Sequence, residues 1–579
     1  MQPCTEDVPD QVNPERRRHN AGNPSDEEQV PESPSSSLSS SDSPTPSEIP
    51  LSRSSSDPET SPERSPELFE DPHFPLNKAI NPSTWGRRET FPGLEWLRVP
   101  EFAERIKKSP VLLPEQNLIT DDVYQRAFPN CIFIAGLSEL TQYPGLLKKI
   151  VPHQPNQNCF ETGKVRFNLW KFGNWEEIVV DDRIPVVNKD EHFGARSSDP
   201  QVFWPPLLEK AYAKHCGGYD GVLFPSDGMA VLTGGLCETI DLKTNTIRDI
   251  TESLEKAKMQ KAMLFAGTKC NGDHDAIGLV SQHEYSVCKT FKITIRSGPL
   301  MGVHDFIILK NPHDPKPLEG WYDGQVNGYH GQWSKVSYEW KATPEDAKKE
   351  IDSHLGPDEF FVSFDTFKQY FDELSICHMD KKNLGIQPGG LNAHQVRGIY
   401  PNPELRLRLK DLSQDSQPSA KEPKDLYKNP RFLLKINGDE NDLVDVIIGL
   451  MVDPKRFEEG VVHFDERKQK IIERLGTFPK LAKVAEVYQE RRRLKSLGLW
   501  IFPIADENCH LQSSDITSYA KLVPKMGPEY TVRNELVEKF QLLPGTYVMI
   551  PAIEANAPDL EFLIRVFTEQ DDVSLHKIV

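Results

Sequence analysis

Apolar and polar positions alternate along the chain with a period that changes from helix-like to strand-like. Apolar side chains recur every three or four residues in 95–109, 131–140 and 203–216, so we expect a helix in each. The third segment has proline near its start and Gly217-Gly218 at its end, the residue order that begins and ends helices. Residues 164–187 alternate with a period of two around Phe172-Gly173-Asn174, which predicts two strands joined by a turn.

Strand patterns dominate from about residue 275 onward, with strands expected at 276–287, 289–295 and 304–312. A polar linker at 410–430 then precedes a second series of apolar segments, and a charged segment at 465–496, predicted to be helical, interrupts that series. The apolar segments are 431–436, 443–452, 496–504, 545–553 and 560–570. Because short strands separated by loops are typical of a β-sandwich, we expect one in this part of the chain.

Residues 1–68 contain almost no side chains that a core would bury, and they are rich in serine and proline. This composition predicts a disordered tail. The tail holds Ser/Thr-Pro steps at Ser33, Ser43, Thr45, Ser61 and Ser65. Two readings stay open: the tail is a substrate of proline-directed kinases, or these steps are simply what disordered segments contain.

The charge balance limits the classes of partner. The 579 residues carry a formal net charge of −19, and the first 70 residues account for −10 of it, with 15 acidic and 5 basic side chains. The remaining −9 provides no basic patch, so we expect no nucleic-acid binding. An acidic folded part is compatible with cation binding, although solubility alone also explains it.

The cysteines and the N-terminus indicate the compartment. The nine cysteines are widely scattered and include no CxxC pair, which argues against a disulfide framework or a zinc site and for a reducing environment. The N-terminus has no apolar signal region, and no apolar run approaches the roughly 18 residues of a membrane span. We therefore expect a cytoplasmic protein.

One cysteine stands where a nucleophile could be activated, in QRAFPNCIF (125–133). Asn130 is a favoured N-cap residue, so Cys131 is expected to be the first residue of a helix, with Phe133, Leu137 and Leu140 on its buried face. The positive end of the helix dipole would favour a thiolate there. Taken alone, the same pattern also fits an unreactive buried cysteine.

A histidine and an asparagine lie in later strands. His283 alternates with apolar neighbours in 276–287, which fits either a buried core residue or a catalytic base. Asn311 ends a predicted strand, and Pro312 favours an extended conformation for it, although an ordinary turn has the same pattern. A cysteine at a helix start with a histidine and an asparagine in strands suits a thiol protease, in which the asparagine orients the imidazole.

The residues from about 67 to 577 resemble the calpain family. QRAFPNCIF aligns without gaps with the family motif Q-G-x-x-G-[DN]-C-W-[FL], VSQHEYSV with its histidine strand G-H-A-Y-S-V, and ILKNPHD with its R-N-P-W-G segment. The segments at 168–186, 203–221 and 360–380 also resemble the protease core. Those at 426–436, 540–552 and 560–570 resemble the C2-like sandwich of calpains.

The resemblance implies an α+β fold, namely a two-lobed papain-like cysteine protease core followed by an all-β C2-like sandwich. We expect the disordered tail at 1–68, the lobe with Cys131 at 69–216, the β-rich lobe with His283 and Asn311 at 217–345, a connecting segment that includes the start of the sandwich at 346–424, and the sandwich at 425–579. Cys131 would be the nucleophile, His283 the general base and then acid, Asn311 the residue that orients the ring, and Gln125 an oxyanion donor.

The implied activity is calcium-dependent limited proteolysis of protein substrates. Two calcium ions assemble the cleft in this family, and the matching acids are Asp122 and Asp199 at one site and Asp323 and Glu359 at the other. Calcium prefers six to eight oxygen ligands, so carboxylates suit it. The sequence contains no penta-EF-hand domain, so we expect a monomer without a small regulatory subunit. The loop 437–445 (NGDENDLVD) suggests either calcium or phospholipid binding, or a solvated hairpin.

Five positions depart from the family motifs: Ile132 and His313 replace tryptophans, and Arg126, Pro129 and Gln282 replace glycines. The tryptophans would shield the thiolate–imidazolium pair, so their loss leaves a second reading open, a catalytically weak or inactive scaffold with the calpain fold. A third reading is a calcium-dependent membrane adaptor that acts through the sandwich.

Overall fold

The computed structural model describes residues 68–80, 93–114, 122–128, 130–154, 159–219, 225–269, 273–316, 328–385, 389–400, 429–452, 496–504, 535–554 and 560–578. These residues belong to one unit, Ser65–Val579. The predicted disordered tail (except Leu68), the polar linker (except its last two residues) and the predicted charged helix (except Ser496) lie outside the described residues. No helix in the described part of the chain has the length and apolar content needed to cross a bilayer.

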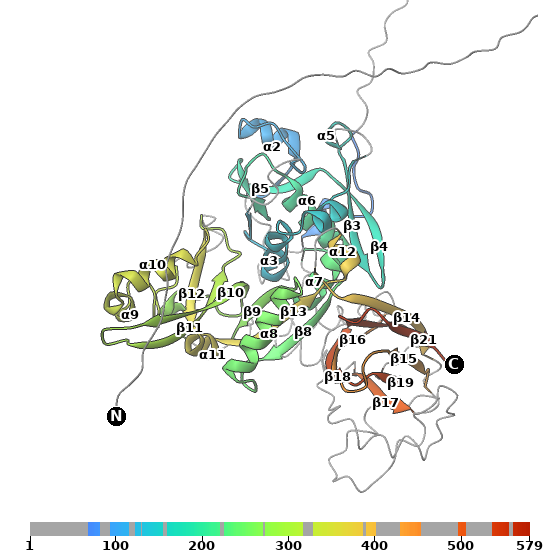
Figure 1. Ribbon diagram of the computed structural model, residues 1–579. Coiled ribbons are helices and arrows are strands. Elements are labelled where there is room, and N and C mark those ends of the chain that lie inside the picture. Colours follow the sequence, from blue (N-terminus) through green and yellow to red (C-terminus); the bar gives the residue numbers. More distant parts are fainter. Residues whose placement is uncertain are drawn as a thin grey trace, which may run out of the picture. The chain divides into compact units, whose positions relative to one another are not determined.

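Short helices and small sheets surround Cys131 in the chain up to residue 233 (Figure 1). The helices are α1 (Leu76–Ala79), α2 (Val99–Arg105), α3 (Cys131–Leu140), α4 (Pro144–Ile150), α5 (Cys159–Thr162), α6 (Trp204–Cys216) and α7 (Pro225–Thr233). The strands form one sheet in the order β1 (Glu95–Arg98), β5 (Arg183–Val187), β6 (Glu191–His192), a pair β2 (Val123–Tyr124) with β7 (Arg196–Ser197), and a hairpin β3 (Lys164–Lys171) with β4 (Asn174–Asp181).

Two of the predicted elements are confirmed here and one is wrong in part. Helix α6 has proline in its first turn and ends at Gly217, whose φ of 85° is accessible to glycine without strain. Hairpin β3–β4 turns at Phe172 and Gly173, both at positive φ, as a tight hairpin requires. The helix expected at 95–109 is limited to α2, because residues 95–98 pair with β5 as strand β1 and the helix begins only at Val99, with Pro100 in its first turn.

His283 directly precedes strand β10 and Asn311 directly follows strand β11, two neighbouring strands of a six-stranded sheet whose strands are labelled in Figure 1. Its strand order is β12 (Glu359–Ser363), β11 (Gly302–Lys310), β10 (Glu284–Ile295), β9 (Met263–Thr268), β13 (Phe371–His378) and β8 (Leu236–Asp241). The 3-10 helix η3 (Asp275–Ile277) precedes β10, and the other helices of this region are α8 (Ile247–Met259), α9 (Tyr338–Ala342), α10 (Glu345–Ser353), α11 (Phe364–Tyr370) and α12 (Lys381–Leu384).

The strand predicted at 276–287 begins only at Glu284. Residues 275–277 form η3, and Gly278 and Gln282 both have positive φ, which breaks an extended strand before His283. The strand expected at 289–295 is the continuation of the same strand β10, with an irregularity between Val287 and Lys289. The strand expected at 304–312 corresponds to β11, which ends directly before Asn311.

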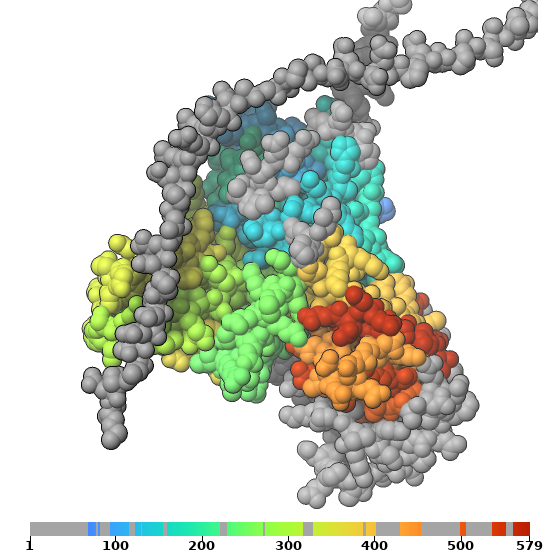
Figure 2. Space-filling view, in the orientation of Figure 1, coloured from blue at the N-terminus to red at the C-terminus, as the bar shows by residue number. Residues whose placement is uncertain are grey.

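Helix α8 shows how the sequence pattern places a helix on this sheet. Thr246 caps it by accepting from the Asp249 amide, and Ile250, Leu254 and Ala257 are buried. Its opposite face is exposed and is visible at the surface in Figure 2, in green. The spacing of the three buried residues therefore determines which face of α8 packs on the sheet.

The C-terminal part is a β-sandwich, as predicted, within the described residues. One sheet has the order β14 (Asn392–Tyr400), β20 (Leu560–Thr568), β16 (Val444–Val452), β18 (Glu535–Leu542). The other has the order β17 (Ser496–Ile504), β19 (Gly545–Glu554), β15 (Phe432–Ile436), β21 (Val573–Lys577). Their inner faces share a core that includes Phe432, Ile448, Met549 and Phe562. The mixed helix and strand content with this sandwich agrees with the α+β class.

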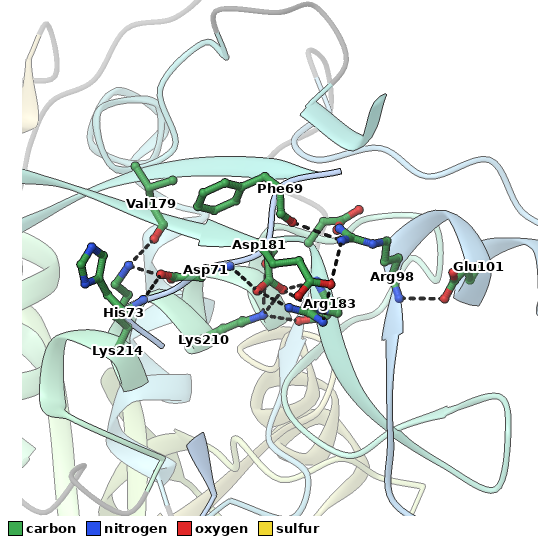
Figure 3. Close-up of polar contacts among 12 residues, drawn as sticks. Phe69, Asp71, His73, Arg98, Glu101, Val179, Asp181, Arg183, Lys210 and Lys214 are labelled. Carbon is green, nitrogen blue, oxygen red and sulfur yellow. Dashed lines mark hydrogen bonds and ion pairs between the residues drawn. The ribbon is translucent and has the colours of Figure 1, made fainter. Parts of the chain in front are cut away.

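A network of buried charges ties residues 69–73 to the elements around Cys131 (Figure 3). Lys210 of α6 and Asp181 of β4 form an ion pair of 2.7 Å, and both side chains are inaccessible to solvent. The Asp71 amide donates to Asp181, and Lys214 donates to the Asp71 carboxylate at 2.7 Å. Burial lowers the pKa of Lys210 to about 8, and the negative charge of Asp181 opposes that shift.

The sandwich contacts the protease-like part through Arg565 of β20. Its guanidinium donates to the carbonyls of Gly234 and Gly235 at 2.8 and 3.0 Å, and to Glu535 at 2.7 Å. The same guanidinium lies 4.4 Å from the centre of the Trp170 ring. A single buried arginine therefore joins two sandwich strands to the chain before β8.

Candidate active site

Cys131 is the first residue of α3, as predicted, and Phe133, Leu137 and Leu140 are fully buried. This buried face packs in an apolar cluster that also contains Met263 and Phe265 of β9. The first turn of α3 is thus held against the six-stranded sheet. The position of Cys131 follows from the burial of the helix that it begins.

Asn130 occupies the N-cap position of α3, but its side chain does not cap the helix. Its amide donates instead to Oε1 of Glu209 at 2.7 Å, and Oε2 of Glu209 accepts from the Ala195 amide at 2.9 Å. The predicted N-cap position is therefore confirmed, but the side chain makes no capping hydrogen bond: Glu209 holds its Nδ2, and its Oδ1, the atom that would cap the helix, has no partner within the described part of the chain. Burial raises the pKa of Glu209 to about 7, and the two hydrogen bonds oppose that rise.

Glu209 should make stability depend on pH. Its folded pKa of about 7 lies above its ordinary value of 4.5, so it stabilises the fold fully below about pH 4.5 and less as the pH rises through 7. That shift corresponds to about 3 kcal/mol at most. We expect Glu209→Gln to flatten the dependence of the free energy of unfolding on pH between 4.5 and 7, measured by urea titration. Glu252→Gln, on the exposed face of α8, is the control; the same slope in the wild type and Glu209→Gln would contradict the assignment.

The Cys131 thiol is neutral in this arrangement. Burial raises its pKa to about 12, and the negative charge of Glu284 adds to the rise, whereas hydrogen bonds from backbone groups of Glu284 and of the helix start lower it. The expected activation by the helix start is present but is outweighed. Attack by this sulfur therefore needs a group that accepts its proton.

His283 and Asn311 are hydrogen-bonded to each other, His283 Nε2 lying 2.9 Å from Asn311 Oδ1. The sheet explains the pairing: β10 and β11 are antiparallel neighbours in which Ser286 opposes Lys310, so the residues just before β10 and just after β11 meet. Burial lowers the pKa of His283 to about 4, and the bond to Asn311 opposes that shift. The imidazole is therefore neutral at pH 7. With Nε2–H donating to Asn311, Nδ1 is left as the acceptor.

Cys131 adjoins this pair through Glu284, the residue after His283, because the Glu284 backbone hydrogen-bonds to the thiol. Gln125 is also buried, and its Nε2 donates to the Phe128 carbonyl at 2.7 Å. A primary amide carries two N–H groups, so a second donor remains on Gln125 Nε2. The structure thus brings together the four residues predicted for catalysis, from three separate parts of the chain.

Comparison with known proteins identifies the family. The model of the calpain family cysteine protease matches residues 69–378, more than half of the chain, and the model of calpain large subunit, domain III, matches residues 385–567. The chain belongs to the calpain family. This places it in a family of cysteine proteases with a catalytic core followed by domain III.

Individual calpains are similar over most of this chain but extend further. Calpain clp-4 of Caenorhabditis elegans is 28% identical over 533 residues, which cover 86% of this chain and 65% of that protein. Calpain-12 of Homo sapiens is 29% identical over 523 residues, which cover 87% of this chain and 67% of that protein. Calpain-A of Drosophila melanogaster is 26% identical over 520 residues, covering 87% and 56%. This chain therefore aligns with between about half and two thirds of the length of each of these calpains.

Three of the substituted motif positions of this calpain have defined surroundings. Ile132 is buried in the apolar cluster of α3. His313 packs against His283 with ring centres 4.0 Å apart, and its amide donates to Asn311 Oδ1 at 3.0 Å. Gln282 has a φ of 53°, which explains the glycine of the family motif at that position. Burial and the electrostatic interaction with His283 lower the pKa of His313 to about 2, so a neutral ring packs against the His283 imidazole. Pro129 lies outside the described residues.

The predicted calcium ligands of this calpain have other partners. The Asp122 carboxylate forms an ion pair with Lys310, and both oxygens of Asp199 accept hydrogen bonds from Gln201 at 3.1 Å. Glu359 accepts from the Gly356 amide at 2.7 Å, and Asp323 lies outside the described residues. The described residues contain no group of three side chains suited to a metal ion. The first site therefore does not fit calcium with these contacts, because a lysine neutralises one of its two acids.

Sequence reasoning missed a buried ion cluster beside the site of this calpain. Arg126 donates to Asp314 at 2.6 Å, and Arg196 donates to both oxygens of the same carboxylate at 2.5 and 2.8 Å. The family motif marks Arg126 only as a replacement for glycine. The available signal was that Asp314 stands at the glycine of the motif R-N-P-W-G, so the two glycine positions carry opposite charges.

Proposed function

We propose that this chain is a papain-like cysteine endopeptidase that cleaves protein substrates through Cys131, His283 and Asn311. The observation that carries the proposal is the 2.9 Å bond between His283 and Asn311 beside the start of the Cys131 helix. A neutral imidazole held by an amide oxygen through one nitrogen presents the other nitrogen as a base. The membership of a cysteine protease family supports the same assignment.

The proposed reaction begins when Nδ1 of His283 takes the proton from the Cys131 sulfur, which attacks the scissile carbonyl carbon. The high pKa of the thiol makes this transfer part of the attack step. The developing oxyanion accepts hydrogen bonds from the Cys131 backbone N–H and from Gln125 Nε2. The amine leaves with the proton from His283, and a thioester remains. Water, deprotonated by His283, then releases the acid and restores the thiol.

The two-lobed architecture belongs to this proposal. The elements around Cys131 form one lobe and the six-stranded sheet forms the other, and substrate binds where α3 meets the start of β10 and the end of β11. The family resemblance adds calcium control. Since Lys310 holds Asp122, calcium would have to displace that lysine, so we expect calcium to modulate activity rather than to be required for it.

The proposed setting is the cytoplasm, and the protein is proposed to act as a monomer without a regulatory small subunit. None of the cysteines in the described residues forms a disulfide, which supports a reducing compartment. A phospholipid surface is a proposed further partner. Its support is Leu443, 60% exposed at the end of the acidic loop 437–445, and Leu543, 46% exposed on the same sandwich.

The second candidate function is a non-catalytic scaffold. The observation that favours it is the neutral thiol of Cys131, together with a Gln125 amide that already donates to the Phe128 carbonyl. A scaffold would keep the fold for binding and would not depend on the thiol.

Labelling of Cys131 separates these two functions. We expect a thiol-directed epoxide to modify the wild-type protein selectively at Cys131, because the neutral imidazole of His283 is placed to accept the proton of that thiol. Cys131→Ala should lose this labelling, whereas Cys216→Ala, which removes another partly exposed cysteine, should keep it. The modified residue is identified by mass spectrometry, with calcium and with a chelator. Equal labelling of wild type and Cys131→Ala would contradict the protease assignment and support the scaffold.

A further inference from the structure

The Arg126–Asp314 contact joins the two segments that carry the candidate catalytic residues. Arg126 lies five residues before Cys131, and Asp314 lies three residues after Asn311. Their side chains are only 5% and 3% exposed, and Arg126 also donates to the carbonyls of His192 and Lys316. Arg126 thus bonds to residues on both sides of the candidate cleft.

Arg196 completes the cluster from strand β7. Its guanidinium donates two hydrogen bonds to the Asp314 carboxylate, from Nε and Nη2, and lies 4.8 Å from the centre of the Tyr124 ring. Burial alone would raise the pKa of Asp314, but the hydrogen bonds and positive charges of Arg196 and Arg126 hold it below its ordinary value. The carboxylate is therefore ionised and fully occupied by cations of the chain itself.

Backbone hydrogen bonds also connect the segment of Gln125 with the segment that follows Asn311. The Gln125 amide donates to the Pro312 carbonyl at 2.7 Å, and the Asp314 amide donates to the Gln125 carbonyl at 3.0 Å. Gln125 and His313 consequently form a parallel β-bridge. The candidate oxyanion residue is therefore fixed, through its own backbone, to the residues that follow Asn311.

Two further polar contacts link residues around β2 with the six-stranded sheet. The Tyr124 hydroxyl donates to Asp358 at 2.9 Å, and Lys310 forms an ion pair with Asp122. All of these contacts connect residues 122–126 and 196 with residues 310–316 and 358. The short segment around β2 is therefore bonded across the cleft along its whole length.

Two residues of the cluster, Arg126 and Asp314, carry charges at positions that are uncharged in the family motifs. In the family motifs that this chain resembles, positions 126 and 314 are both glycine, so neither side could form an ion pair there. Here one position is basic and the other acidic, and the two side chains meet. A buried ion pair that is well hydrogen-bonded holds its elements in one geometry, and the loss of one partner is strongly unfavourable.

We propose that the Arg126–Asp314–Arg196 ion cluster assembles the catalytic cleft of this protein without calcium. The three side chains act as positioning residues: they hold Gln125 and the Cys131 segment against the segment of Asn311. The inference rests on the proposed function for its catalytic consequence, but the assembly itself is a property of the fold that can be measured without activity.

The test of assembly is amide hydrogen exchange of the full chain, resolved at Gln125 and Asp314, in a chelator and in calcium. We expect both amides to be protected in the chelator, with no further protection from calcium. In Arg126→Ala/Asp314→Ala we expect exchange at both amides to be about tenfold faster or more, since their opening no longer breaks the ion cluster. Arg126→Lys, which keeps the charge but has fewer donors, should give an intermediate rate.

The matched control is Arg166→Ala/Glu177→Ala, which removes an arginine–carboxylate pair from hairpin β3–β4 without crossing the cleft. It should leave exchange at Gln125 and Asp314 unchanged. Exchange at these amides that is fast in the wild type until calcium is added would overturn the inference. Equal exchange in the wild type and Arg126→Ala/Asp314→Ala would overturn it too.

The catalytic consequence is read from epoxide labelling of Cys131. We expect the wild type to be labelled in the chelator at a rate within about twofold of that in calcium, and Arg126→Ala/Asp314→Ala to be labelled about tenfold more slowly or less in the chelator. Wild-type labelling that requires calcium would overturn the inference. If Cys131 is labelled in neither condition, the proposed protease function fails, and the exchange rates still decide whether the ion cluster assembles the cleft.

Discussion

Replacing His283 with alanine is expected to lower kcat/KM for a fluorogenic peptide by about 10²- to 10⁴-fold. The reason is the state of the thiol: burial raises the pKa of Cys131 to about 12, so almost no thiolate is present at pH 7 without a base. The neutral imidazole of His283, held through Nε2 by Asn311, is placed to supply that base. The loss should appear mainly in kcat, because His283 acts on the proton in the transition state rather than in substrate binding.

A buried histidine elsewhere in the same sheet provides the control. His378 of β13 is 3% exposed and bonds to Glu238 at 2.9 Å, and its replacement by alanine should leave kcat/KM nearly unchanged. The wild-type rate should also stay level as the pH falls to about 5 and should decrease by about half near pH 4, the pKa of His283, because the protonated imidazole cannot accept the thiol proton. Activity in His283→Ala within about fivefold of the wild type would show that this residue is not the base.

Replacing Glu535 with leucine is expected to lower the free energy of unfolding by about 3 to 5 kcal/mol. Glu535 is the carboxylate partner of Arg565, whose side chain is 1% exposed. Its removal leaves a buried guanidinium whose remaining acceptors, within the described part of the chain, are the carbonyls of Gly234 and Gly235, and carbonyl dipoles do not replace a full negative charge. The measurement is urea unfolding of the full chain, followed both by fluorescence and by circular dichroism.

An exposed glutamate in an ion pair is the matched control for Glu535. Glu252 pairs with Arg248 on the surface of α8, and both side chains are more than half exposed. Glu252→Leu should change stability by less than about 1 kcal/mol, because solvent screens that pair. Similar effects of the two substitutions would mean that Arg565 finds water or another partner when Glu535 is lost, and would contradict the buried charge described above.

The local elements of the site were predictable because their causes lie within a few residues. Helix α3 begins at Cys131 and buries Phe133, Leu137 and Leu140, as the apolar spacing predicts. Helix α6 ends at Gly217, and β11 ends directly before Asn311, where proline follows. Period, capping order and the backbone limits of glycine and proline act along the chain, so a reader of the sequence can apply them without knowing what packs nearby.

The local tendencies that do not prevail concern groups whose partners are distant in sequence. Asn130 is the N-cap residue, as predicted, yet its side chain makes no capping hydrogen bond, because its Nδ2 is held by Glu209, 79 residues away. Cys131 is at the positive end of a helix, yet burial and Glu284 raise its pKa. A helix cap or the helix dipole stabilises its group by about 1 kcal/mol, whereas burying a charged group costs several kcal/mol. The tertiary environment therefore decides.

What the sequence by itself determined was the family, the approximate positions of α3, α6, hairpin β3–β4 and β11, and the identity of the four candidate catalytic residues. Only the tertiary structure decided how the two sides of the cleft are held together. The pairing of Arg126 with Asp314 spans 188 positions, and that of Lys310 with Asp122 spans the same number. The physical reason is that the sequence does not show which distant residue will pair with a given charged side chain. Folding brings the two together, and only then does their burial make the contact strong.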